Sequence, residues 1–198
     1  MNSYDYLLTR TKLIPINETL NSLFSYINKY KSLNKMRVLE IGIGNGGSSI
    51  PMSVKFKSYY GIEPLSNIYD VFIKSCKEHK CSIKSYNMDL EKFVNTTNKK
   101  FDLIILRNVI QFIGHNELIK QCKKIVNKNA FIIIQNRKAH PFGWGDKELN
   151  KDSAEFNEIK WLKYKNLLES HYSVLLNSKY FDKFDKDDRY VFYVLKIK

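Results

Sequence analysis

Cysteine and long apolar runs are both scarce in this chain. Its three cysteines are odd in number and lack a Cys-x-x-Cys spacing, which predicts a reducing compartment and argues against a disulfide scaffold. No apolar run approaches the roughly 18–20 residues that a membrane-spanning helix needs, and the first residues lack the pattern of a secretory signal. We therefore expect a cytoplasmic protein without a membrane span.

Arginine is also rare, and this affects how the net charge of +13 is interpreted. Only five of the 33 basic residues are arginine, whereas asparagine and isoleucine are abundant. Lysine, asparagine and isoleucine have AT-rich codons, so a high lysine content arises without a selected partner. Phosphate recognition favours the planar fork of arginine. The charge therefore favours solvated lysines over a nucleic-acid footprint, although nucleic acid stays a possible partner.

The chain of 198 residues is long enough for one domain, and its 43% hydrophobic share is typical of a globular protein. Short apolar runs alternate with amphipathic helical stretches, which predicts a mostly parallel sheet covered on both faces. We expect a single domain over residues 1–198, with an N-terminal helical extension over 1–36 and an irregular loop over 136–152. The predicted strands are Arg37–Gly42, Ser58–Glu63, Ser82–Asn87, Phe101–Leu106, Ala130–Gln135, Tyr172–Lys179 and Tyr190–Ile197. Helices are predicted from Asn17 as N-cap to about Tyr30, from Ser48 to about Phe56, after Ser66 as cap, around Leu118–Val126, and from Asp152 to about Ser170.

A glycine-rich segment follows the first predicted strand. Gly42, Gly44 and Gly47 satisfy the Gly-x-Gly-x-x-Gly pattern, which on its own also describes a turn that only packs strand on helix. One interpretation is a dinucleotide with its pyrophosphate on this loop. The other is S-adenosylmethionine, whose amino-acid end carries an ammonium and a nearby sulfonium. Glu40 favours the second, because a carboxylate there repels a pyrophosphate and suits a cationic ligand.

Two further acids follow predicted strands at the same edge of the sheet. Glu63 ends the second strand, where a carboxylate can accept hydrogen bonds from both ribose hydroxyls. Asp89 follows the third strand, where it can accept from an adenine amino group while Met88 and Leu90 flank the ring. The alternative for Asp89 is that it caps a following helix.

Taken together, these residues resemble the class I S-adenosylmethionine-dependent methyltransferases. Glu40-x-Gly42-x-Gly44-x-Gly46 resembles the first motif of that family, and Phe101-Asp-Leu-Ile-Ile-Leu-Arg is similar to its fourth-strand motif. The resemblance covers about residues 37–197. It implies a doubly wound, Rossmann-like α/β fold of three layers, with seven strands of which the C-terminal one is antiparallel, and it implies methyl transfer. The cofactor-binding residues that it implies are Glu40, Gly42, Gly44, Asn45, Gly46, Glu63, Pro64, Asp89, Leu90 and Arg107.

Candidates for the chemistry lie after the fourth and fifth strands. His140 in the irregular loop and His115 at the start of a helix are candidate general bases, and for each of them an exposed or capping role is the alternative. Asn108, Arg137 and Trp144 are the candidate acceptor-binding residues. Histidines, cysteines and acids do not stand at metal-ligand spacing, so we predict no metal.

Departures from known variants of the family narrow the acceptor. The segment after the fourth strand, Arg107-Asn108-Val109, lacks the Asp/Asn-Pro-Pro-aromatic pattern that enzymes use on amino groups of DNA bases. With no appended recognition domain, the sequence favours O-methylation of a small molecule, a sugar or another glycan acceptor. The alternatives are an RNA methyltransferase that uses Lys120, Lys123, Lys124 and Lys128, and a catalytically silent subunit with the same fold.

Overall fold

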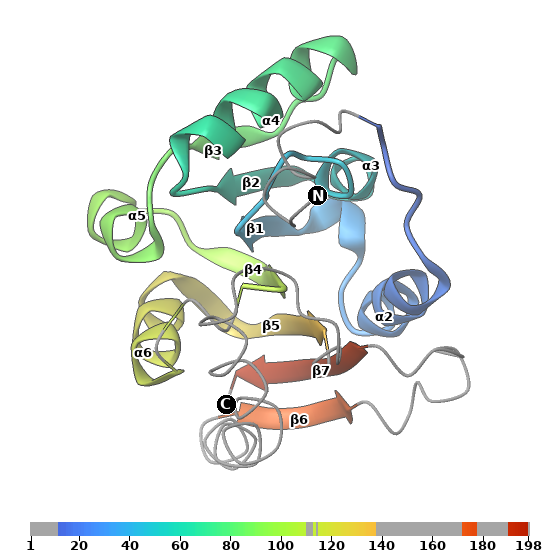
Figure 1. Cartoon of the computed structure of the whole chain (residues 1–198). Helices are drawn as coiled ribbons and strands as arrows, with labels where there is room; N and C mark the ends of the chain where they lie inside the picture. The colour runs from blue at the N-terminus through green and yellow to red at the C-terminus, as the bar shows by residue number, and fades with distance from the viewer. Residues whose placement is uncertain (1–11, 110–112, 114, 138–171, 178–189, 198) are drawn as a thin grey trace.

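The described part of the chain folds as a seven-stranded sheet with helices on both faces (Figure 1). The computed structural model describes residues 12–109, 113, 115–137, 172–177 and 190–197. Strand order is β3-β2-β1-β4-β5-β7-β6, in which β1 to β5 are parallel and β7 runs antiparallel to both of its neighbours. The predicted doubly wound fold, with seven strands and an antiparallel C-terminal strand, is therefore confirmed.

Each predicted strand has a counterpart in the structure. The strands are β1 (Arg37–Ile41), β2 (Ser58–Ile62), β3 (Lys84–Tyr86), β4 (Phe101–Arg107), β5 (Val126–Arg137), β6 (Tyr172–Asn177) and β7 (Tyr190–Ile197). The helices are α2 (Glu18–Asn28), α3 (Ser49–Ser53), α4 (Ser66–Glu78), α5 (Leu90–Thr96) and α6 (His115–Ile125), with a 3-10 turn, η1, at Leu33–Lys35.

Two apolar clusters lie on the two faces of the sheet. One joins α2 to the face of β1 and β4 that carries Val38, Leu103 and Ile105. The other joins α5 and α6 to the opposite face, where Leu39 and Ile104 project. Side chains alternate between the two faces along a strand, so a strand buried on both sides must be apolar at consecutive positions. Such apolar runs are the pattern that predicted the strands.

Several boundaries differ from the predictions for local reasons. Asn17 caps α2 as predicted, with its side chain accepting the Leu20 amide at 2.8 Å. Ser66 is the first residue of α4 and not its cap, because its hydroxyl instead donates to Asn87 Oδ1. β5 extends to Arg137, so the irregular loop predicted from residue 136 begins later than expected. The rest of that loop and the helix predicted after Asp152 lie outside the described residues.

The structure contains one disulfide that the cysteine pattern did not predict. Cys76, in the last turn of α4, forms a disulfide with Cys81. The backbone turns back at Lys80, which has a left-handed φ of 51°, and brings the two Cα atoms to 4.9 Å, within the range that a disulfide spans. Cys122 is free and buried, and burial raises the pKa of its thiol to about 12.

Asp102, at the amino end of β4, ties three elements together. Its carboxylate accepts hydrogen bonds from the Lys31 ammonium at 2.6 Å, the Arg37 amide at 2.9 Å and the Asn127 side chain at 2.7 Å. Burial alone raises the pKa of this carboxyl, but the three donors outweigh burial and lower it below the ordinary value. The carboxylate therefore stabilises the fold in its charged form.

Replacing Asp102 by asparagine is expected to lower the free energy of unfolding by about 1–3 kcal/mol at pH 7, because charged hydrogen bonds are lost. A lowered carboxyl pKa contributes stability above the unfolded-state value of about 4, and the contribution disappears as the pH falls through the folded-state pKa. The difference in the free energy of unfolding between wild type and the asparagine variant should therefore become smaller below about pH 4. Urea unfolding at several pH values measures it, and a gap that widens on acidification contradicts this account.

Within the described part of the chain, none of the helices has the length and the apolar content to cross a membrane.

Candidate functional site

The loop between β1 and α3 has a backbone conformation that residues with a Cβ atom rarely adopt. Gly42 has φ 74° and Gly46 has φ 83°, both in the left-handed region that favours glycine. A Cβ on Gly42 would lie 2.2 Å from Cγ1 of Val109, and one on Gly46 would lie 2.7 Å from Cδ2 of Phe72. Glycine is therefore required here for two reasons, the turn itself and the close approach of the β4 end and of α4.

Hydrogen bonds hold the loop in place against β2 and the N-terminal segment. The Gly42 and Ile43 amides both donate to the Ile62 carbonyl, at 2.9 and 3.1 Å. Asn45, at the edge of burial, accepts the Gly47 amide at 3.2 Å. The Gly47 carbonyl in turn accepts the Ile14 amide at 2.8 Å, so the segment before α2 crosses the loop.

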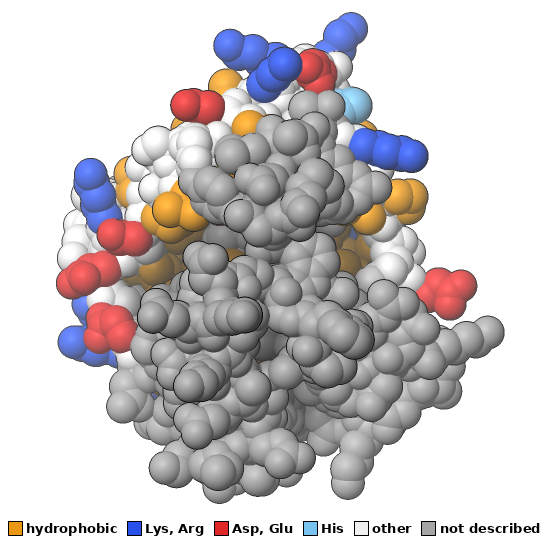
Figure 2. Space-filling view, in the orientation of Figure 1, with side chains coloured by type: hydrophobic (Ala, Val, Ile, Leu, Met, Phe, Trp, Pro, Cys, Tyr) orange, Lys and Arg blue, Asp and Glu red, His pale blue; other side chains and the backbone are white. Residues whose placement is uncertain are grey.

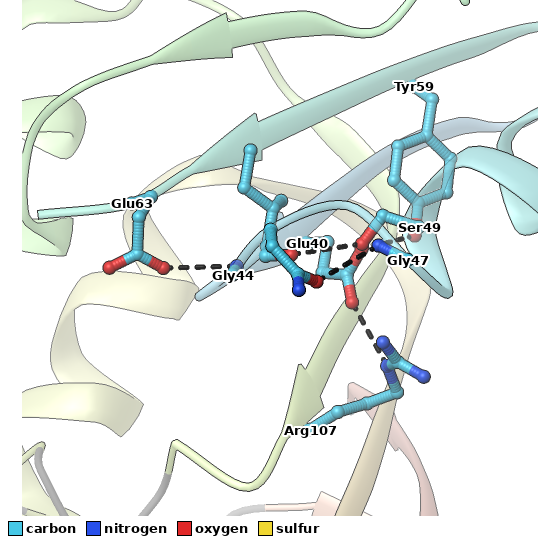
Figure 3. A network of polar contacts seen from close by, with 9 residues as sticks. Glu40, Gly44, Gly47, Ser49, Tyr59, Glu63 and Arg107 are labelled. Carbon is cyan, nitrogen blue, oxygen red and sulfur yellow. Dashed lines mark hydrogen bonds and ion pairs between the residues drawn. The ribbon is translucent and has the colours of Figure 1, made fainter. Parts of the chain in front are cut away.

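Glu63, directly after β2, lies beside this loop (Figure 3). One carboxylate oxygen accepts the Gly44 amide at 3.0 Å, and the other accepts the Leu65 amide at 3.2 Å. Burial raises the pKa of the Glu63 carboxyl, although these two amides oppose the rise. A carboxylate has about four acceptor positions. The two that remain match the two hydroxyls of a ribose, so the observed contacts fit the predicted role.

The region after β3 is built differently from the prediction. Asp89 accepts the Lys92 amide at 2.8 Å and caps α5, so its capping role is confirmed, while contact with an adenine stays a prediction. Leu90 is 6% exposed and belongs to the core, whereas Pro64 is exposed. Sequence reasoning missed Asn87, whose side-chain amide donates to the Glu63 carbonyl at 2.8 Å. Its position at the end of a strand was the available signal.

Glu40 is fully buried and, within the described part of the chain, contacts two polar partners (Figure 3). The Tyr59 hydroxyl donates to one carboxylate oxygen at 2.8 Å, and Nε of Arg107 donates to the other at 3.0 Å. Burial, and then the charge of Glu40, raises the pKa of Tyr59, so this phenol stays protonated as a donor. The interpretation of Glu40 as a carboxylate facing a cationic ligand did not anticipate that Arg107 balances its charge. Direct contact of Glu40 or Arg107 with a cofactor stays a prediction.

The carboxyl end of β4 carries a second unusual backbone. Asn108 has φ 55°, a conformation that asparagine tolerates better than most residues, and its amide donates to the Gln135 carbonyl at 2.8 Å. Arg137 is the last residue of β5 and His115 the first of α6, while His140 and Trp144 lie outside the described residues. In the described ranges, histidines, cysteines and acids do not gather into a metal-binding group.

Comparison with known proteins adds to this geometry. Residues 38–129, which run from β1 to the start of β5, match the family model described as "Methyltransferase domain". That range contains the glycine loop, Glu63 and the end of β4. A little under half of the chain is thus similar to methyltransferase domains. This similarity agrees with the S-adenosylmethionine-dependent methyltransferase family predicted from the sequence motifs.

The relatives of this chain are distant. Over 142 residues it is 22% identical to the ubiquinone biosynthesis O-methyltransferase of Rickettsia akari, which covers 69% of this chain and 55% of that protein. The chain thus spans about half the length of this curated relative. TehB from Haemophilus influenzae has a similar fold, with a TM-score of 0.59 at 14% identity over 89% of this chain and 62% of that one.

A third comparison concerns a structure with ligands. The geranyl diphosphate C-methyltransferase of Streptomyces coelicolor, in complex with Mg²⁺, geranyl diphosphate and S-adenosyl-L-homocysteine, gives a TM-score of 0.63 at 12% identity. The similarity covers 91% of this chain and 79% of that one. At these identities the structural likeness establishes the fold.

Proposed function

We propose that this class I methyltransferase transfers a methyl group from S-adenosylmethionine to an oxygen of a small polar acceptor such as a sugar or sugar conjugate. The observation that carries the proposal is the arrangement of Glu63 beside the glycine loop, with Gly44 donating to its carboxylate at 3.0 Å. This arrangement retains acceptor capacity for a ribose. A ligand with a bulky anionic pyrophosphate fits less well beside the buried carboxylate of Glu63.

When bound, S-adenosylmethionine supplies an activated methyl group on a sulfonium, so the protein mainly has to position the two reactants. In this proposal the glycine loop and Glu63 hold the donor. A hydroxyl acceptor also has to lose its proton as the new carbon–oxygen bond forms, and a ring nitrogen of His140 or His115 takes it. Asn108, Arg137 and Trp144 bind the acceptor.

Two observations support oxygen as the methylated atom. The candidate bases are histidines, whose pKa lies near physiological pH and suits proton transfer from a hydroxyl. The relative from Rickettsia akari is an O-methyltransferase, although the match covers 55% of that protein. A small acceptor does not need a positively charged docking surface. The high net charge is then interpreted as lysines dispersed over the surface.

RNA is the second candidate acceptor. Four exposed lysines, Lys120, Lys123, Lys124 and Lys128, follow α6 and the start of β5. Lys120 lies 3.8 Å from the Glu117 carboxylate, however, and Lys124 contacts Gln121. On the described part of the face in Figure 2, lysine and arginine side chains stand among acidic and uncharged ones. This mixture favours solvated lysines over a phosphate-tracking surface.

An experiment with isotopically labelled methyl donor distinguishes a small acceptor from RNA. The protein is incubated with a cell extract and S-adenosylmethionine carrying an isotopically labelled methyl group, and products are identified by untargeted mass spectrometry. Label in a small hydroxyl compound or glycan supports the proposal, whereas label in RNA favours the second candidate. RNA binding that is sub-micromolar and sequence-selective at physiological salt also favours RNA. Absence of label, together with absence of S-adenosylhomocysteine binding by calorimetry, contradicts both.

Replacing His140 or Trp144 by alanine is expected to leave S-adenosylhomocysteine affinity nearly unchanged and to lower methyl transfer. If His140 is the base, turnover falls by about 100-fold, and the loss shrinks for acceptors of lower pKa. If His140 only positions the acceptor, the change appears mainly in the acceptor KM. Steady-state kinetics with the identified acceptor distinguish these results, and unchanged kinetics in both variants place the acceptor site elsewhere.

A further inference from the structure

The side-chain oxygen of Gln135 is a buried hydrogen-bond acceptor near the carboxyl end of the sheet. Gln135 is 5% exposed, and its Oε1 has no hydrogen-bond partner among the residues that the structure describes. Nearly all buried polar atoms in folded proteins are paired, because an unpaired one destabilises the fold. An exception at this edge of the sheet points to a group supplied by another molecule.

A hydrogen-bond donor stands on the neighbouring strand. Gln135 of β5 and Arg107 of β4 are register partners, so their side chains project to the same face with Cβ atoms about 5 Å apart. Nε of Arg107 donates to Glu40, and the two terminal nitrogens of the guanidinium carry four further N–H donors. The Arg107 side chain is 18% exposed. A donor and an acceptor therefore stand next to each other.

The charges around Arg107 and Gln135 indicate which kind of ligand group can bind between them. Glu40, 3.0 Å from Arg107, neutralises its charge, so the pair does not call for an anionic ligand. A hydroxyl is neutral and both accepts and donates, which suits Arg107 on one side and Gln135 on the other. We propose that Gln135 positions a hydroxyl-bearing acceptor: Oε1 accepts the hydroxyl proton in a hydrogen bond while the guanidinium of Arg107 donates to the hydroxyl oxygen.

Gln135 lies far enough from the proposed ribose ligand to contact the acceptor and not the ribose. Glu63, the proposed ribose ligand, follows β2, and β5 lies three strands away in the order β2-β1-β4-β5, about 14 Å across the sheet. A neutral amide does not take up a proton at physiological pH, so Gln135 acts as a positioning residue and a separate base is needed. This inference rests on the proposed function, because it concerns the acceptor of that reaction.

Two glutamine variants test the proposal. Gln135→Met keeps the size of the side chain and removes the unpaired oxygen. Gln121→Met is the matched control, because Gln121 is 2% exposed but its amide contacts Glu117 and its oxygen accepts from Lys124. We expect the urea midpoint to fall in Gln121→Met and to stay level or rise in Gln135→Met. An equal fall in both variants gives Gln135 a structural role and overturns the proposal.

Kinetics with two hydroxyl probes, catechol and methyl α-D-glucopyranoside, supply the second measurement. We expect labelled methyl transfer to at least one probe, a KM about tenfold higher in Gln135→Met with a nearly unchanged kcat, and partial rescue by Gln135→Glu, which retains an acceptor oxygen. Unchanged KM overturns the proposal, as does a wild-type protein that labels an extract compound but neither probe. Failure to bind S-adenosylhomocysteine would instead overturn the proposed function.

Discussion

Replacing Arg107 by methionine is expected to lower the free energy of unfolding by about 3–5 kcal/mol. The reason is that Glu40 has no exposed surface and keeps its carboxylate buried when the guanidinium at 3.0 Å is removed. Tyr59 still donates one hydrogen bond at 2.8 Å, but a neutral phenol does not balance the charge. Urea unfolding at pH 7 with linear extrapolation measures the effect.

A double-mutant cycle separates the ion pair from a loss of packing. Adding Glu40→Gln to Arg107→Met removes the uncompensated charge, so the double variant should recover much of the lost stability. Lys120→Met is the surface control, because Lys120 and Glu117 are 67% and 46% exposed and such pairs contribute little. If the free energy of unfolding of Arg107→Met is within about 1 kcal/mol of the wild-type value, the buried ion pair does not stabilise the fold as expected.

Replacing Glu63 by alanine is expected to weaken S-adenosylhomocysteine binding by about 1–3 kcal/mol, which is roughly 5-fold to 150-fold in Kd. The variant removes the charged acceptor proposed for both ribose hydroxyls and also frees the Gly44 and Leu65 amides that it holds at 3.0 and 3.2 Å. Calorimetry measures the loss, with Glu91→Ala as a control at an exposed acid in the first turn of α5. Tighter binding of NAD than of S-adenosylhomocysteine by the wild type would contradict the cofactor assignment.

The same carboxyl makes binding depend on pH. Burial raises the pKa of Glu63 above its ordinary value, so the group takes up a proton at a higher pH than an exposed glutamate does. Protonation removes the charged acceptor, and affinity for S-adenosylhomocysteine should therefore fall as the solution is acidified. In Glu63→Gln this titration is absent, so affinity should be low and flat over the same range. A wild-type affinity that rises on acidification contradicts the proposed role.

Much of the fold follows from local sequence patterns. Strands such as Phe101–Arg107 are apolar at consecutive positions because both faces of the sheet are covered, and that pattern is visible without a structure. For α5 the only sequence signal is Asp89 as a helix cap, because the seven residues of this helix are too few to show a periodic pattern. The Cys76–Cys81 disulfide was missed because its formation depends on the reversal of the backbone at Lys80.

Some residues of the candidate site are also recognisable in the sequence, and others are not. Gly42, Gly46 and Glu63 are recognisable in the sequence, because a glycine turn and an acid directly after a strand are local features. Asn87 was missed because its position after a strand is a weak signal, and its contact with the Glu63 carbonyl is visible only in the structure. His140 and Trp144, in the loop after β5, stay predictions from the sequence alone.

Local sequence patterns suffice to predict the order of the strands and helices along the chain, the glycine loop and the acid of the proposed ribose site, because each depends on residues close together in the chain. Which buried polar groups have partners depends instead on contacts between distant parts of the chain. Glu40 and Arg107 are 67 residues apart in the chain and meet because β1 and β4 are neighbours. Beside them, the side-chain oxygen of Gln135 has no partner among the residues that the structure describes. Strand pairing brings distant side chains to one edge of the sheet, where burial makes every unbalanced charge and unpaired atom costly.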